Sequence, residues 1–264
     1  MRRSGTLAAI GAYALWGAFP IYWKAIQEVP AFETLCHRIT WSFLFLVILL
    51  LSVKRWGWIQ QVKERPTTLL TFLGTATLLS LNWFIYIWAV NAGRLVDTSM
   101  GYFINPLLSV LLGVFFLKER LRLWQWISVG IAAAAVTYLT LSYGHIPWVA
   151  LTLAGTFGFY GLLRKTAPLG AIEGLSIETA FMLLPALAYL VYLESSGIGA
   201  FGHAPAKTNA LLSLSGVATA LPLILFNYGA KRIALATVGI LQYIAPTGQF
   251  LLGVLAYGEA FEGV

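Results

Sequence analysis

Two basic side chains lie near the start of a long apolar run at residues 33–53. His37 and Trp41 are one helical turn apart, and Arg38 lies beside them. A charged side chain at the bilayer centre costs on the order of 2.5–3.5 kcal/mol on insertion scales, so it usually faces a cavity or a partner. We therefore expect Arg38 to anchor a carboxylate or another anionic group, with His37 and Trp41 beside it. The alternatives are that Arg38 extends to the interface or pairs with Glu33, and that His37 is a packed structural histidine.

A second group of candidates lies on the run at 68–90. Asn82 and Tyr86 are one turn apart, and Trp83 follows Asn82 directly. An amide at this depth either hydrogen-bonds a ligand or bonds across to a neighbouring helix, which is worth about 1 kcal/mol. Asn82, Trp83 and Tyr86 are predicted to line a ligand cavity by hydrogen bonding and ring stacking. Helix–helix bonding is the alternative for Asn82.

The composition indicates which elements must position these side chains. The chain has 264 residues, of which 59% are hydrophobic and only 10% charged, whereas soluble domains are about 25% charged. A soluble fold could not cover that much apolar surface, which excludes soluble enzymes, nucleic-acid-binding proteins and disordered chains as primary interpretations. The single cysteine, Cys36, excludes an internal disulfide and any CxxC metal or redox site.

Nine apolar runs approach the length of about 20 residues that a membrane-crossing helix needs. They are residues 5–26, 33–53, 68–90, 97–117, 124–143, 146–163, 175–193, 209–229 and 236–257. With the N-terminus inside, thirteen of the seventeen Lys and Arg residues fall in cytoplasmic segments and three in external ones, while Arg38 lies within a run. This bias predicts a multi-pass membrane protein whose N-terminus is cytoplasmic.

Two segments resemble each other at a separation of 140 residues. FINPLLSVLLGVFFLKER at 103–120 and YIAPTGQFLLGVLAYGEA at 243–260 share seven of 18 positions. Apolar composition does not easily explain the matches Pro106/Pro246, Gly113/Gly253 and Glu119/Glu259. Fainter matches at separations of 144 and 145 are Tyr13/Phe157, Trp16/Tyr160 and Glu33/Glu178. The sequence therefore contains an internal duplication.

The duplication predicts the architecture. The repeat unit holds five spans, and because five is odd the second copy enters the membrane from the opposite side. We expect an all-α integral membrane fold with two inverted five-helix halves, at 1–145 and 146–264. The second half is expected to have four helices, because the tenth would fall beyond Val264. Inverted repeats recur in secondary transporters, whose substrate site lies near the midplane between the halves.

The duplicated segments supply further candidates. Tyr102, Asn105 and Ser109 share one helix face, and the matching positions of the second copy are Gln242, Ala245 and Gln249. We expect this polar stripe to line the central cavity, with Tyr243 beside it.

Three residues of the duplicated segments carry backbone roles. Pro106 and Pro246 are predicted hinges for alternating access, because a mid-span proline frees a carbonyl and kinks its helix. A static kink is the alternative. Glu119 is expected to cap the next helix or to pair with Arg120 or Arg122.

The sequence resembles the RarD group of the EamA family, in the drug/metabolite transporter superfamily. The likeness is carried by HRITWS at 37–42, NWFIYIWAVN at 82–91, GYFINPL at 101–107 and QYIAPT at 242–247. The resemblance implies ten helices in two inverted halves, location in the bacterial cytoplasmic (inner) membrane, and export or exchange of small metabolites, amino acids or drugs.

We therefore expect a secondary transporter without a cofactor or a metal. Its partners would be a small-molecule substrate and the lipid bilayer, with no nucleic acid, and a homodimer is one expected assembly. An integral-membrane enzyme is an alternative, but the sequence lacks DDxxD, HExxH, GxSxG and Walker motifs. A membrane scaffold is the other alternative, although it would not need polar stripes matched between inverted copies.

Overall fold

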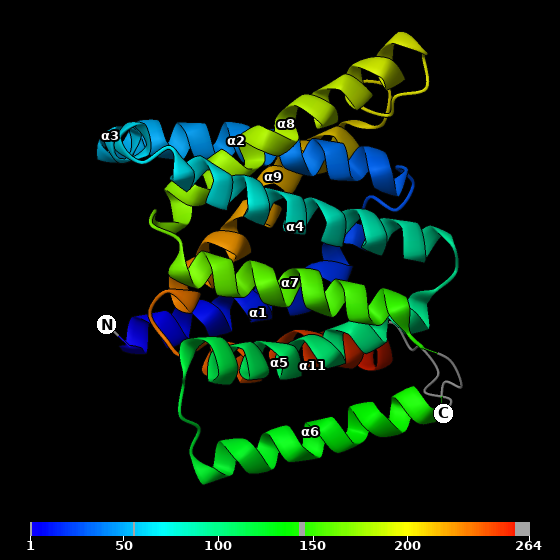
Figure 1. Cartoon of the computed structure of the whole chain (residues 1–264). Helices are drawn as coiled ribbons and strands as arrows, with labels where there is room; N and C mark the ends of the chain where they lie inside the picture. Colours follow the sequence, from blue (N-terminus) through cyan, green and yellow to red (C-terminus); the bar gives the residue numbers. More distant parts are fainter. Residues whose placement is uncertain (1, 55, 143–145, 257–264) are drawn as a thin grey trace. The chain divides into compact units, whose positions relative to one another are not determined.

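The computed structural model describes residues 2–54, 56–142 and 146–256, and within them the fold is entirely helical (Figure 1). The helices are α1 (Arg2–Lys24), α2 (Ala31–Val53), α3 (Gly57–Glu64), α4 (Thr67–Asn91), α5 (Leu95–Leu117), α6 (Leu123–Ser142), α7 (Trp148–Thr166), α8 (Ala171–Ser195), α9 (Ala206–Ala230), α10 (Leu235–Leu241) and α11 (Ile244–Leu251), followed by a π-helical turn at Leu252–Ala256. The predicted all-α class is confirmed. Glu259, the expected partner of Glu119, lies outside the described residues.

Eight of the nine predicted runs each form one helix, and the ninth is divided into α10 and α11. In the described part of the chain, seven segments are long and apolar enough to cross a membrane: Arg2–Lys24, Ala31–Val53, Thr67–Asn91, Asp97–Leu117, Ala171–Ser195, Ala206–Ala230 and Leu235–Ala256. Helix α6 contributes a shorter apolar stretch, Leu123–Tyr138. The last turn of α7 carries Arg164 and Lys165, and these two charged residues lower the mean hydropathy of the helix.

The helix ends follow from local chemistry. Helix α2 begins after Pro30, whose ψ of 136° is extended. Lys54 and Lys118 end α2 and α5 in the left-handed conformation, with φ of 51° and 54°. After Lys118, the Glu119 N–H donates to the Gly113 carbonyl at 3.1 Å, so the chain turns back on the end of α5. This turn directs the Glu119 side chain back along α5, toward α10.

The chain forms two compact units, and each combines segments from both predicted halves. The first unit takes the described residues within 1–18, 78–166 and 226–264, and the second takes those within 19–77 and 167–225. Helices α1, α4 and α9 are each divided, with one part in the first unit and the other part in the second. Repeat-related segments are therefore neighbours within a unit, as α2 and α8 are in the second.

In the first unit, α5 packs along α7 and is crossed by α10. The crossing is close because Gly239 has no side chain: a Cβ there would lie 2.7 Å from the Pro106 carbonyl oxygen and 3.0 Å from the Ser109 Cβ. On α7, the missing side chain of Gly158 similarly leaves room for the Leu108 side chain of α5. Helix α6 touches α5 along fewer residues and lies at the outside of this unit in Figure 1.

In the second unit, α2 packs on α8 and on the first part of α9. A Cβ at Gly216 of α9 would lie 2.2 Å from the carbonyl carbon of Trp41, so α9 can cross α2 only with glycine at this position. Ser42 donates its hydroxyl to the Gly216 carbonyl at 3.0 Å. The repeat-related acids Glu33 and Glu178 are both buried in this unit, with 1% and 0% exposed.

Candidate functional site

Arg38 is half-buried in the second unit and is held by two other segments. Its Nε donates to the Thr219 hydroxyl of α9 at 2.9 Å. Its Cζ lies 4.6 Å from the centre of the Trp23 ring, near the end of α1, a distance typical of cation–π attraction. These contacts fix the guanidinium plane, and that arrangement suits recognition of a planar anion better than a freely moving lysine would.

His37 and Trp41 lie together with Phe201, a residue that the sequence did not single out. The His37 ring is 4.9 Å from the Phe201 ring, and the Trp41 ring is 5.9 Å from it. Glu33 completes the group: its Oε1 accepts the Ala200 N–H at 2.6 Å and lies 3.9 Å from His37 Nε2. The segment between α8 and α9 is thereby fastened onto α2, and both ring nitrogens of His37 lack a hydrogen-bond partner among the described residues.

Asn82 bonds two groups of α7 in the first unit. Its Nδ2 donates to the Leu153 carbonyl at 2.9 Å and to the Thr156 hydroxyl at 2.8 Å. This is the helix–helix bonding considered as the alternative. Trp83 beside it is half-buried. Tyr86 pairs edge-on with Tyr102 at a ring distance of 6.3 Å, and both rings are exposed by more than a third.

Two of the three residues in the polar stripe of α5 are covered by neighbouring helices. Asn105 and Ser109 are each 5% exposed, and the Ser109 hydroxyl donates to Asn105 Oδ1 at 3.4 Å. Gly239 of α10 lies against Ser109. In the second copy, Gln242 is buried, and Gln249 donates to the Trp16 carbonyl at 3.0 Å. Gly239 therefore lets α10 pack on the stripe of α5, and Gln249 joins α11 to α1.

The two prolines have different local surroundings. Pro106 lies inside a continuous α5. Pro246 lies in the first turn of α11, where its missing N–H leaves no unmet intrahelical bond. One turn earlier, the Gln242 carbonyl accepts the Ala245 N–H at 3.1 Å, because Pro246 has no N–H to offer it. The ninth predicted span divides at this point.

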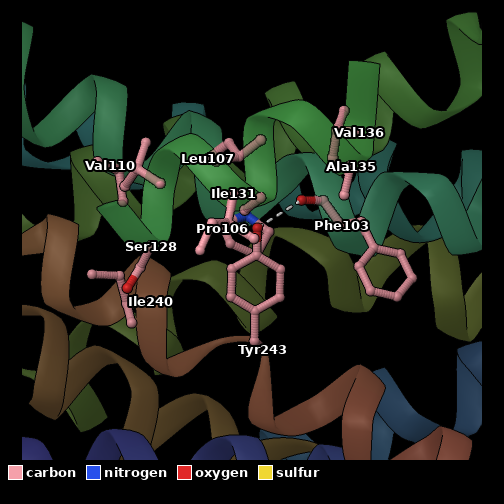
Figure 2. Close-up of a pocket in the computed structure, with 12 residues that line it drawn as sticks. Phe103, Pro106, Leu107, Val110, Ser128, Ile131, Ala135, Val136, Ile240 and Tyr243 are labelled. Atoms are coloured by element: carbon pink, nitrogen blue, oxygen red, sulfur yellow. Dashed lines mark hydrogen bonds between the residues drawn. The ribbon is translucent and has the colours of Figure 1, made fainter. Parts of the chain in front are cut away.

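A cavity of ≈ 440 Å³ lies between α5, α6 and α10 in the first unit, and Figure 2 shows its walls. Its lining is apolar apart from the hydroxyls of Ser128 and Tyr243, and Tyr243 donates to the Phe103 carbonyl at 3.3 Å. Of the predicted site residues, only Pro106 and Tyr243 line it. Such a space suits an acyl chain or an apolar ring better than a polar metabolite.

The structure adds Asn227 to the polar residues of the first unit. It is fully buried, and its Nδ2 donates to the Tyr160 hydroxyl at 3.0 Å. A sequence signal existed, because Asn82 and Asn227 are 145 residues apart, the separation of Glu33 and Glu178. Among the residues described, no group of three His, Cys, Asp or Glu side chains is arranged to hold a metal ion.

The chain matches known proteins over almost its whole length. Residues 3–141 match the EamA-like transporter family. The protein RarD of Streptomyces exfoliatus is 43% identical over 98% of this chain and 82% of its own length. The uncharacterized transporter YojE of Bacillus subtilis is 48% identical over 98% and 88%. The protein RarD of Escherichia coli K12 is 41% identical over 97% and 87%.

A solved crystal structure, 20% identical in sequence, superposes with a TM-score of 0.72 over all of this chain and 92% of its own, which shows a shared fold. With these matches, the apolar helices identify a multi-pass membrane protein. The chain belongs to the EamA-like transporter family.

Proposed function

We propose that the protein is a secondary transporter that exports or exchanges a small metabolite, amino acid or drug by alternating access. Its membership of a family whose relatives are named transporters supports the general activity. The observation that supports a specific chemistry is Arg38, a half-buried cation held between Thr219 and Trp23. We infer that the transported molecule carries a carboxylate or another anionic group that binds Arg38.

The guanidinium is suited to this role. It presents five N–H donors, and a carboxylate can accept two of them in parallel. The Thr219 hydroxyl accepts a hydrogen bond from Nε, and this bond orients the plane of the guanidinium. In apolar surroundings such a charge attracts an anion more strongly than it would in water.

We also propose a location and an orientation. The protein would lie in the bacterial cytoplasmic membrane with its N-terminus inside, because most Lys and Arg residues then face the cytoplasm. Single cysteines placed beside Lys63 and beside Lys207, in a chain whose Cys36 is replaced, should react from opposite sides of the membrane. Labelling from the same side would overturn the orientation.

The transport proposal is tested with the full chain in liposomes. Uptake is followed for a panel of radiolabelled carboxylates, amino acids and amphipathic drugs. We expect saturable uptake of at least one anionic compound, and Arg38→Ala should abolish it while Arg38→Lys retains a part. Arg94→Ala is the matched control, because Arg94 also lies near tryptophan rings but is exposed.

The outcomes separate the two levels of the proposal. If Arg38→Ala and the unmodified protein take up an anion equally well and saturably, the anion site at Arg38 is rejected. The transporter assignment would then still stand. The absence of saturable uptake for every compound would reject the transporter assignment itself and favour a scaffold.

A further inference from the structure

Five aromatic rings gather in the first unit, away from the cavity between α5 and α6. They come from three helices, and they are Tyr13 and Trp16 of α1, Phe157 and Tyr160 of α7, and Phe226 of α9. Phe226 lies at the centre of the cluster, with its ring 5.3–6.2 Å from each of the other four. We call this group the aromatic cluster.

The cluster is built from repeat-related residues. Tyr13 and Trp16 of α1 occupy positions that match Phe157 and Tyr160 of α7 at a separation of 144 residues. The edge-to-face pair of Trp16 and Phe157, with centroids 5.8 Å apart, joins the two copies. Both copies of the duplication therefore place aromatic side chains at the same location in the unit.

The rings of the cluster differ in burial. Tyr13, Tyr160 and Phe226 are 0–2% exposed, whereas Trp16 and Phe157 are only partly buried. These two rings do not lie on the outward faces of their helices. Trp16 shares a face with the buried Ala12 and Ala9, and Phe157 shares one with the buried Leu153 and Ala150. Both rings therefore lie on helix faces that also carry buried residues, and part of each ring remains accessible.

Two buried polar atoms at the cluster have no hydrogen-bond partner among the described residues. They are the Tyr13 hydroxyl and the Oδ1 of Asn227. Asn227 is fixed by its bond to Tyr160, so its Oδ1 is held in place as an acceptor. Because a buried polar group without a partner costs about 1–3 kcal/mol, such atoms indicate that a ligand or water satisfies them.

The residues of the cluster favour an uncharged ligand. The five rings and Asn227 carry no charge, so a charged ring among them would be buried without a counter-charge from these side chains. A neutral ring with an O–H or N–H donor fits both the rings and the acceptor oxygens.

We propose that the aromatic cluster binds a planar, uncharged aromatic ring bearing a hydrogen-bond donor, such as a phenol or an indole. The cluster lies wholly within the first unit, so this inference goes beyond the anion site proposed above. Trp16 and Phe157 stack on the ring, and Asn227 accepts its donor hydrogen.

The test measures binding rather than transport. The purified full chain in nanodiscs is titrated with 4-fluorophenol, and the ¹⁹F linewidth is compared with that of 4-fluorocyclohexanol, which has the same donor and no aromatic ring. We expect saturable broadening for 4-fluorophenol alone. Phe157→Leu should raise its Kd by about two- to twelvefold, because an aromatic pair is worth about 0.5–1.5 kcal/mol beyond its buried area. Asn227→Leu should also weaken binding.

Matched variants guard against misfolding. Phe159→Leu is the control, because Phe159 is on the same helix, is 42% exposed and lies outside the cluster. Trp16→Leu, on α1, removes a different ring of the cluster and is used if Phe157→Leu fails to fold. Equal broadening by both probes would overturn the proposal. So would a Kd for 4-fluorophenol that is unchanged in both Phe157→Leu and Trp16→Leu. Either result would be compatible with saturable uptake of an anion by the same protein. Failure of this proposal can therefore be told apart from failure of the transport function.

Discussion

Glu119 offers a sharp test of how the first unit is assembled. It follows α5, and its Oε1 and Oε2 accept the N–H groups of Leu235 and Ala236 at 2.7 and 2.9 Å. These are the first two residues of α10, so the carboxylate caps that helix across 116 residues of sequence. Lys165 Nζ lies 3.6 Å from Glu119 Oε1 and donates to the carbonyls of Ala230 and Ile233.

The magnitude follows from these contacts. A hydrogen bond to a charged group contributes about 1.5–3 kcal/mol, and a lost helix cap costs about 0.5–2 kcal/mol. The two bonds share one carboxylate and are not additive, so Glu119→Ala should cost about 2–4 kcal/mol. Part of that cost arises because Lys165, whose side chain is only 18% exposed, loses its acidic partner. Glu119→Gln keeps one acceptor and should cost less.

The assay is thermal unfolding of the detergent-solubilised protein, followed by tryptophan fluorescence. On the scale of soluble domains of this size, 2–4 kcal/mol corresponds to a Tm lowered by about 4–16 °C. Glu64→Ala is the control, because that exposed carboxylate accepts a hydrogen bond from Gln60 on its own helix and its loss should shift Tm little. An unchanged Tm in Glu119→Ala, or a shift no larger than that of Glu64→Ala, would refute the capping role.

Three further changes test other contacts. Gly239→Ala should lower Tm and separate α10 from α5, because its Cβ would meet a carbonyl oxygen at 2.7 Å, whereas Gly130→Ala on α6 meets nothing within 4 Å and should leave Tm unchanged or raise it. Asn82→Leu should destabilise the protein by about 1 kcal/mol, measured by the same unfolding assay, because two cross-helix bonds are lost. Glu28 lies in the segment after α1, and the hydrogen bond from Thr208 lowers the pKa of its carboxyl. Its contribution to stability is therefore present above the pKa of the unfolded state and lost as pH falls through the folded value, so Thr208→Val should reduce the loss of Tm between pH 6 and pH 3.

Much of the fold was predictable because long apolar runs leave few choices. A run of about 20 apolar residues in a bilayer must be helical, since every backbone group has to be bonded within it. The eight undivided helices follow from this rule. The division between α10 and α11 was harder to place, because it depends on how the Gln242 carbonyl finds a donor one turn before Pro246.

The partners of side chains were less predictable than the helices. A capping role for Glu119 was expected from its place after α5, but on the helix that follows it, whereas the structure shows it on α10. Periodicity indicates which face of a helix is buried, and it carries no information on which distant segment covers that face. For the same reason Phe201 and Phe226 were missed, because both are ordinary apolar residues until packing brings them to His37 and to Trp16.

Counterflow tests the central claim most directly. Liposomes holding the full chain are loaded with a high concentration of an unlabelled substrate found in the uptake panel, then diluted into a trace of the labelled form. An alternating-access carrier exchanges the two, so we predict that internal label transiently exceeds its equilibrium level, and that Arg38→Ala removes this overshoot. A monotonic approach to equilibrium, identical in liposomes without protein, would contradict the account.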